Sequence, residues 1–336
     1  MKLTVLGAGS WGLTLTWLLA HRFDRVSLWG RAQSLDDELV NTKCCAKPVS
    51  VQLASSVMVT SDLSAAIDGA DIVLNAVATK GVREVCQQLK VCGVKSEQIL
   101  LNASKGLELP SLMRMSEVIH EVLPEQKVAV LSGPTIAKEV LDGKPTAACV
   151  ASVDMATAKM VQQTCSVNDR FRLYTNCDVV GVELGGSLKN VIAIAAGLVH
   201  ALKLGDNCLA AMLTRGIAEI ARISVRLGAD LQTIYGLAGL GDLITTCTSS
   251  MSRNYTVGFM LGCGKKLTEI LANLRAVAEG VNTARAVYLL VQQLGLETPI
   301  LQAVYQLLYT DIDPYSLISQ LMNRKLIAED RGCATT

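Results

Sequence analysis

The chain has 336 residues, 50% of them hydrophobic and 18% charged, which is enough for two domains that each bury an apolar core. The formal net charge of +1 argues against a broad basic surface for nucleic acid and against a polybasic segment for a membrane surface. The 11 cysteines form no C-x-x-C pair and the 3 histidines show no metal-ligand spacing, so we expect free thiols in a reducing, cytoplasmic compartment and no metal site.

Short strands and helices alternate through the first half of the chain. A strand at Leu3–Leu6 stops at a glycine-rich turn, and a helix at Leu13–Ala20 follows. Because glycines interrupt this apolar run, a strand, turn and helix explain it better than a signal peptide does. Further elements are a helix near Leu63–Ile67 and strands at Arg25–Trp29, Asp71–Val77, Gln98–Asn102, Val128–Leu131, Thr146–Ser152 and Phe171–Tyr174. The alternation predicts a parallel sheet with helices on both faces.

The character of the sequence changes near Asp178. From there to about Ile327 the pattern is helical, rich in Ala, Leu and Ile, without a convincing strand. Its most apolar stretch, Asn190–Leu202, is too short to span a bilayer, so we interpret it as a buried core helix and expect no membrane insertion. We predict an α/β domain at residues 1–178, an all-α domain at 179–328 and a frayed tail at 329–336. Helical, apolar domains often pair, so a homodimer is an open alternative to a monomer.

The glycine-rich turn has the spacing G-x-G-x-x-G at Gly7, Gly9 and Gly12. Gly7 permits the tight turn, Gly9 lets the backbone approach a pyrophosphate, and Gly12 allows the helix to pack closely on the strand. The N–H groups and the positive dipole end of the helix that follows attract phosphate. A glycine turn without a ligand is the alternative. The position between a strand and a helix favours a Rossmann-type domain that binds a nicotinamide dinucleotide.

The end of the second strand bears on the choice of dinucleotide. Sites that prefer NAD place an Asp or Glu about 20 residues after the glycines, where it binds the ribose 2′-hydroxyl. Here the strand ends Trp29-Gly30-Arg31, without an acid. Because an arginine suits a 2′-phosphate, the sequence favours NADP(H), with NAD(H) as the alternative. Arg31 as an ordinary solvated surface residue also stays open.

Four further segments carry side chains suited to catalysis or to phosphate binding. Lys105 follows an expected strand at the carboxyl edge of the sheet, where ligands bind, and Ser132–Ala137 follows the next strand with a hydroxyl and backbone N–H groups. Lys189 lies in an apolar helix, where burial lowers the pKa as a proton-transfer group requires. Asp242 is placed to tune a nearby lysine, and Ser252–Asn254 offers donors to a phosphate.

Each of these residues also has an ordinary structural interpretation. Lys189 can extend to solvent, Asp242 can cap a helix, and Arg253 can be a surface charge. In combination, however, the segments resemble those of the soluble, bacterial-type NAD(P)-dependent glycerol-3-phosphate dehydrogenase family, over nearly the whole chain. The motifs that carry the resemblance are GAGSWG, SKGLE, SGPTIAKEV, YTNCDVVGVELGGSLKNVIAIAAG, LGDN, TRGIAEI, GLAGLGDLITTCTSSMSRN and AEGVNTARAV.

The resemblance implies an all-α second domain like that of 6-phosphogluconate dehydrogenase, and an activity. That activity is reversible hydride transfer between sn-glycerol 3-phosphate and dihydroxyacetone phosphate, which supplies glycerol 3-phosphate for glycerophospholipid synthesis. It implies that Lys189 is the proton acceptor, with Thr246 beside it. The implied substrate positions are Lys105, Gly133, Thr135, Lys189, Asp242, Ser252, Arg253 and Asn254. The implied cofactor positions are Gly7, Gly9, Ser10, Trp11, Gly12, Arg31, Lys105, Ala137, Arg253, Val277 and Glu279.

The sequence departs from the family in places that remove no catalytic group. Ala78-Thr-Lys replaces a turn that usually contains proline, and Asn41–Thr60 carries Cys44-Cys45 where an aromatic residue is expected. Two rival functions stay open. A 3-hydroxyacid or 6-phosphogluconate-type dehydrogenase would differ in its substrate. A non-enzymatic NADP-sensing protein would have no need of both Lys105 and Lys189.

Overall fold

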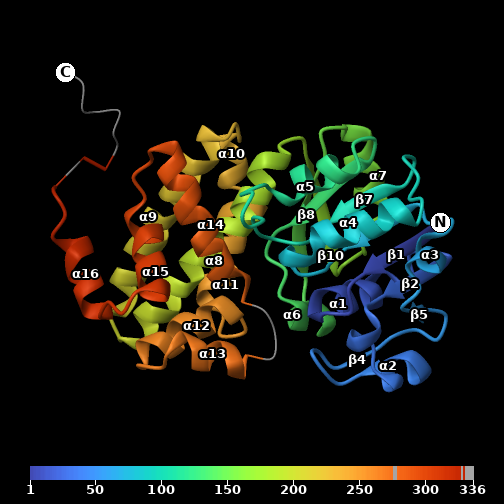
Figure 1. Ribbon diagram of the computed structural model, residues 1–336, viewed down its shortest axis with the longest axis horizontal. Coiled ribbons are helices and arrows are strands. Elements are labelled where there is room, and N and C mark those ends of the chain that lie inside the picture. The colour runs from blue at the N-terminus through green and yellow to red at the C-terminus, as the bar shows by residue number, and fades with distance from the viewer. Residues whose placement is uncertain (275–277, 327, 330–336) are drawn as a thin grey trace.

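The computed structural model describes residues 1–274, 278–326 and 328–329. An α/β domain formed by the first half of the chain lies beside a helical domain formed by the second half (Figure 1). The predicted fold class, a Rossmann-type domain followed by an all-α domain, is confirmed. Most of the tail predicted at 329–336 lies outside the described residues.

The first domain is built on an eight-stranded sheet with the order β10-β9-β8-β7-β6-β1-β2-β5. The sequence predicted seven of these segments, and β2 has the predicted bounds. The short β5 was not predicted, nor was the small hairpin of β3 (Cys44–Cys45) and β4 (Val51–Gln52). The strands of the sheet are β1 (Lys2–Leu6), β2 (Arg25–Trp29), β5 (Met58–Thr60), β6 (Ile72–Asn75), β7 (Ile99–Asn102), β8 (Lys127–Ser132), β9 (Thr146–Ala151) and β10 (Phe171–Asn176).

One strand pair corrects the prediction of a wholly parallel sheet. β9 runs antiparallel to β8, with Leu131 opposite Val150, while every other neighbouring pair of the eight-stranded sheet is parallel. Parallel neighbours need a long crossover, usually through a helix that packs on the sheet. The connection from β8 to β9 contains only the five-residue α6 (Ala137–Leu141). The longer α7 (Met155–Cys165) then makes the crossover from β9 to the parallel β10.

Helices cover both faces of the sheet, as predicted. One apolar core joins the sheet to α1 (Ser10–Leu19), α6 and α7. A second core, on the opposite face, joins it to α3 (Leu63–Ile67), α4 (Val82–Val91) and α5 (Met115–Val122). Adjacent residues in a strand supply opposite cores, for example Val5 and Leu6 of β1, because successive side chains point to opposite faces of a sheet. Short helices follow two of the strands: η1 (Ala32–Ser34) and α2 (Asp37–Thr42) come after β2, and η2 (Thr79–Gly81) comes after β6.

The second domain is arranged around one long helix, α8 (Val179–Ala201), which contains the predicted core segment Asn190–Leu202 except for its last residue. By length and composition α8 is apolar enough to cross a membrane, but 94% of its most apolar window is buried inside the protein. The elements that pack against α8 are α9 (Gly205–Arg226), α10 (Leu231–Ile234), the π-helix η3 (Leu237–Gly241), α11 (Asp242–Thr248), α12 (Arg253–Gly262), α14 (Glu279–Leu294) and α15 (Pro299–Tyr309). Further out, α13 (Leu267–Asn273) packs on α12 and α16 (Pro314–Met322) packs on α15. Within the described residues this domain has no strand.

Candidate active site

The glycine turn after β1 is shaped to receive a ligand. Gly7 has a φ of 109°, and a Cβ on Gly12 would lie 1.8 Å from the carbonyl oxygen of Gly7. Glycine at both positions therefore lets α1 start close against the turn. A Cβ on Gly9 would have nothing within 4 Å, which leaves room for a pyrophosphate. Ser10 and Trp11 begin α1, whose first N–H groups have no side-chain cap. These features fit the dinucleotide expected from the sequence.

A cavity of about 310 Å³ runs from this turn to the end of β2. Arg31, a predicted cofactor residue, lines the cavity. Its guanidinium group forms an ion pair with Glu84 of α4, with Nη2 2.6 Å from Oε2. Glu84 and Lys80 also line the cavity, and neither was predicted. No local signal marks them, because only the sheet order β6-β1-β2 brings the start of α4 to the end of β2.

Two lysines and an aspartate that are far apart in sequence form one cluster. Nζ of Lys105 lies 2.7 Å from Oδ2 of Asp242, and Nζ of Lys189 lies 3.0 Å from Oδ1 of the same carboxylate. Lys189 also donates to Oγ1 of Thr246 at 2.5 Å, and Lys105 to the carbonyl oxygen of Gly133 at 2.9 Å. Lys189 and Asp242 are buried, with 7% and 2% of their surfaces exposed. Five residues predicted from the sequence are thus in direct contact.

The surroundings of Lys189 favour its neutral form. Burial is the largest influence and lowers its pKa, and the nearby charge of Lys105 lowers the pKa further. The carboxylate of Asp242 acts in the opposite direction and raises it. A lysine whose pKa is lowered in this way is suited to accept a proton from a hydroxyl group.

The cluster lies where the two domains meet. Lys105 follows β7, Gly133 follows β8, and Lys189 lies in the middle of α8. The π-helix η3, which ends at Gly241, places Asp242 at the start of α11. Close packing of η3 on α8 depends on Gly185, since a Cβ there would lie 2.8 Å from the carbonyl oxygen of Ala238. π-helical turns of this kind are frequent at functional sites.

The segment after β8 brings the site to the glycine turn. Gly133 has a φ of 141°, and a Cβ there would lie 2.9 Å from the Cα of Ala148 in β9. Oγ1 of Thr135 donates to the carbonyl oxygen of Gly133 at 3.2 Å, so Thr135 is held beside the acceptor of Lys105. Ala137 begins α6, which packs against α1. This arrangement places the segment between the lysine cluster and the dinucleotide helix.

The predicted phosphate-binding segment is fixed to α8 through Asn254. Its Nδ2 donates to Oδ1 of Asn190 at 2.8 Å, and its Oδ1 accepts from the backbone N–H of Gly280 at 2.9 Å. Ser252 caps α12 by accepting from the N–H of Tyr255. Arg253, between these two residues, is exposed. The segment is therefore anchored to α8 at the residue that follows Lys189. Burial lowers the pKa of the Arg253 guanidinium group, and the nearby carboxylate of Glu279 raises it.

Glu279 links the helical domain to the dinucleotide-binding domain. Its Oε1 accepts from the backbone N–H of Thr79 at 3.2 Å, and Oγ1 of Thr79 donates to the carbonyl oxygen of Lys105 at 3.3 Å. Burial raises the pKa of Glu279. Thr79 was noted in the sequence only as part of an unusual turn, so its contact with both segments was not predicted. Val277, the other predicted cofactor residue of this segment, lies outside the described residues.

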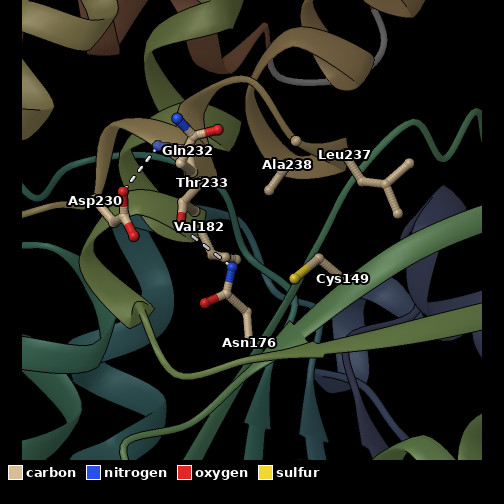
Figure 2. A pocket seen from close by; sticks show the side chains of 9 residues that line it. Cys149, Asn176, Val182, Asp230, Gln232, Thr233, Leu237 and Ala238 are labelled. Carbon is tan, nitrogen blue, oxygen red and sulfur yellow. Dashed lines mark hydrogen bonds between the residues drawn. The ribbon is translucent and has the colours of Figure 1, made fainter.

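A second cavity, of about 230 Å³, contains none of the predicted site residues. It lies between the ends of β9 and β10 and the segment from α10 to η3, where Asn176 donates to Thr233 and the thiol of Cys149 faces the same space (Figure 2). Burial raises the pKa of Cys149 to about 11, which makes this thiol a poor nucleophile. Among the described residues, no group of three or more His, Cys, Asp or Glu side chains is placed to hold a metal ion.

Comparison with known proteins identifies the family of this chain. The model of the NAD-dependent glycerol-3-phosphate dehydrogenase N-terminus matches residues 2–158, and the model of the C-terminus matches residues 178–319. The chain belongs to this family. The resemblance inferred from its motifs is confirmed.

Similar proteins match along nearly their full lengths. Glycerol-3-phosphate dehydrogenase [NAD(P)+] of Thermoanaerobacter sp. is 44% identical over 96% of this chain and 97% of its own. The protein of the same name from Enterococcus faecalis is 45% identical over 96% of each chain. The crystal structure of glycerol-3-phosphate dehydrogenase from Coxiella burnetii superposes with a TM-score of 0.91 at 34% identity, and covers 96% of this chain and 99% of its own. The family relationship therefore extends through both domains.

Proposed function

We propose that this protein catalyses the reversible NAD(P)-dependent oxidation of sn-glycerol 3-phosphate to dihydroxyacetone phosphate. The observation that carries the proposal is the buried contact of Lys105 and Lys189 with Asp242, at the carboxyl edge of the sheet that also bears the glycine turn. A dinucleotide-binding protein without catalysis has no use for two lysines at this cost of burial. Family membership supports the same reaction.

In this proposal Lys189 is the general acid and base. A dinucleotide held at the glycine turn of Gly7 and Gly9 would supply the acceptor of the C2 hydride in oxidation and its donor in reduction. During oxidation the neutral amine of Lys189 accepts the proton of the C2 hydroxyl group, and during reduction the ammonium group returns it. Thr246 and Asp242 hold Nζ of Lys189 in one orientation. The ammonium group of Lys105, held by the other oxygen of Asp242, stabilises negative charge on the same substrate oxygen.

The substrate phosphate is assigned to Ser252, Arg253 and Asn254. The guanidinium group of Arg253 offers a fork of donors for phosphate oxygens. One N–H of the Asn254 amide is bonded to Asn190, which leaves the second N–H for the ligand. The contact between Asn254 and Asn190 sets the distance from this segment to Lys189. We therefore expect phosphate binding to position C2 beside the proton acceptor.

The proposed cofactor is NADP(H), with NAD(H) as an alternative. Arg31 and Lys80 give the cavity beyond the glycine turn two positive charges, which favours a 2′-phosphate. We further propose a cytoplasmic enzyme that supplies glycerol 3-phosphate for glycerophospholipid synthesis. Every cysteine in the described part of the chain is a free thiol, which agrees with a reducing compartment. A homodimer stays a prediction, and light scattering of the purified chain distinguishes it from a monomer.

The proposal is tested by following the absorbance of reduced nicotinamide. Purified protein is mixed with NADPH or NADH and with dihydroxyacetone phosphate, unphosphorylated dihydroxyacetone or a 3-hydroxyacid. We expect rapid oxidation only with the phosphorylated triose. Binding of NADPH without turnover of the phosphorylated triose would contradict the proposed reaction. Turnover of the 3-hydroxyacid instead would assign the site to a different dehydrogenase.

A further inference from the structure

The cavity at the end of β2 is lined by an acidic residue, Glu84, that lies far from β2 in the sequence. NAD-binding sites usually carry an Asp or Glu at the end of the second strand, and this chain has Arg31 there. In the folded protein, Glu84 reaches the same place from the first turn of α4, 53 positions along the chain. Its Oε2 is 2.6 Å from Nη2 of Arg31. The acid missing from β2 is therefore supplied by a different element.

The charges around this cavity oppose one another. Among its lining residues, Arg31 and Lys80 are positive and Glu84 is negative. Arg31 and Glu84 are about equally exposed, with 51% and 55% of their side-chain surfaces accessible. An ion pair this exposed is weak and readily exchanges partners. The guanidinium group can thus be redirected to a ligand while the carboxylate stays within the cavity.

We propose that Glu84 is a specificity-determining residue that limits the preference for a 2′-phosphorylated dinucleotide. The proposal rests on the assignment of this cavity to the dinucleotide in the proposed function. A phosphate monoester carries nearly two negative charges at neutral pH, so the carboxylate of Glu84 repels it and competes with it for Arg31. A free 2′-hydroxyl group has no charge and can donate to a carboxylate. Glu84 therefore keeps NAD(H) binding competitive with NADP(H) binding.

The position of Arg31 explains why Glu84 has this influence. A Cβ on Gly81 would lie 3.4 Å from Nη2 of Arg31, so the guanidinium group lies over the first turn of α4. Ser34 donates to the carbonyl oxygen of Arg31 at 2.7 Å and fixes the backbone after β2. Glu84 is three residues beyond Gly81 and holds one edge of the guanidinium group. Replacing it frees donors of Arg31 without moving the backbone that carries them.

The test compares the binding of two adenosine phosphates that differ at the 2′ position. Isothermal titration calorimetry at low ionic strength measures adenosine 2′,5′-bisphosphate and adenosine 5′-monophosphate with wild-type protein and with Glu84→Gln. We expect Glu84→Gln to bind the bisphosphate about threefold to tenfold more tightly, and the monophosphate within about twofold of wild type. The gain should shrink as salt is added, because exposed charges are screened.

Glu125→Gln is the matched control, since it removes the same charge from an exposed position. Glu125 precedes β8 and so lies at the amino ends of the strands, whereas the cavity lies at their carboxyl ends. This substitution should leave both affinities unchanged. An unchanged or weaker affinity of Glu84→Gln for the bisphosphate would overturn the inference, as would an equal gain in Glu125→Gln. Failure of wild-type protein to bind either compound would overturn the cofactor site itself. Discrimination between the two compounds without turnover of dihydroxyacetone phosphate would overturn only the proposed reaction.

Discussion

Lys189 is a charged side chain on an otherwise apolar helix, and its contacts explain why the fold tolerates it. An isolated buried ammonium group is too costly to persist. Here the carboxylate of Asp242 and the hydroxyl group of Thr246 surround Nζ. Asp242 also binds Lys105, so a single carboxylate serves two lysines. One carboxylate cannot fully compensate two ammonium groups, so the neutral form of one lysine is favoured. Lys189 is the more buried of the two lysines, and burial lowers its pKa.

Replacing Lys189 with methionine should stop catalysis without removing the cofactor site. Methionine fills similar space but cannot accept a proton, so kcat should fall by at least about 100-fold. NADPH binding, measured by fluorescence titration, should stay within about twofold of wild type, because Lys189 lies outside the cavity at the glycine turn. Lys159→Met on the exposed face of α7 is the control. Normal turnover by Lys189→Met would remove this residue from the mechanism.

Asp242 makes the pH dependence of catalysis testable. Reduction of the ketone requires protonated Lys189, so its rate falls as the pH rises through the pKa of Lys189. The carboxylate of Asp242 raises that pKa. In Asp242→Asn the pKa should drop, and the alkaline fall in kcat should move to lower pH. Thr246→Val, which removes a hydrogen bond but no charge, should move it much less. A shift of the Asp242→Asn profile to higher pH would contradict this account.

At the scale of elements, the closest packing in the second domain is that of α12 on α8. A Cβ on Gly258 of α12 would lie 1.8 Å from the carbonyl oxygen of Ile194, and a Cβ on Gly197 of α8 would lie 2.0 Å from that of Tyr255. Glycine on both helices therefore lets their backbones touch. This crossing also fixes the start of α12, which carries Arg253 and Asn254. Helix packing and phosphate binding depend on the same contact.

The substitution Gly258→Ala should separate these two helices. Overpacking of a well-packed interface costs about 1–3 kcal/mol, and here the clash is with backbone, so we expect at least about 2 kcal/mol of lost unfolding free energy in urea. The KM for dihydroxyacetone phosphate should also rise, since α12 carries the phosphate-binding segment. Cys263→Ala, at the exposed end of the same helix, should change neither quantity. Wild-type stability of Gly258→Ala would show that α12 adjusts freely.

At the scale of the whole molecule, Glu183 joins the two domains. It lies on α8, six positions before Lys189, and is 6% exposed. Its carboxylate accepts from the N–H and hydroxyl groups of Ser116, at the start of α5, and pairs with Arg114 at 2.7 Å. The first domain carries Lys105 and the second carries Lys189. The Glu183 contact therefore helps to hold the catalytic lysines in register across the domain boundary.

Removing this contact should weaken both stability and catalysis. Glu183→Ala removes the buried carboxylate that pairs with the partly buried Arg114. Breaking a buried ion pair costs about 3–5 kcal/mol of unfolding free energy. We expect a lower unfolding midpoint and a reduced kcat, with NADPH binding retained. Glu117→Ala is the control, because Glu117 pairs with the same arginine at 2.8 Å but is exposed. Equal effects of the two substitutions would show that the anchor is Arg114 rather than Glu183.

The sequence by itself determined the features that depend on short stretches of chain. The spacing of Gly7, Gly9 and Gly12 predicted the turn, because Gly7 adopts a positive φ and Gly12 packs against the carbonyl oxygen of Gly7, five residues earlier. Periodicity predicted the strands that carry Lys105 and Gly133 to the sheet edge, and the apolar helix around Lys189. Motifs then indicated the family. Periodicity does not encode strand direction, which is why the strand β9 was predicted but its antiparallel course was not. The strand β5 was not predicted because its three residues are too few to show an alternation.

Only the tertiary structure decided which side chains meet. The contacts of Lys105, Lys189 and Asp242 join residues up to 137 positions apart, and they depend on how α8 and η3 pack against the sheet. Glu84 meets Arg31 because β6 and β2 flank β1, an order that no local pattern records. Propensity and periodicity act over a few residues, whereas charge pairing depends on distance in space. The sequence therefore determined the elements and their chemistry, and the packing of those elements determined the site.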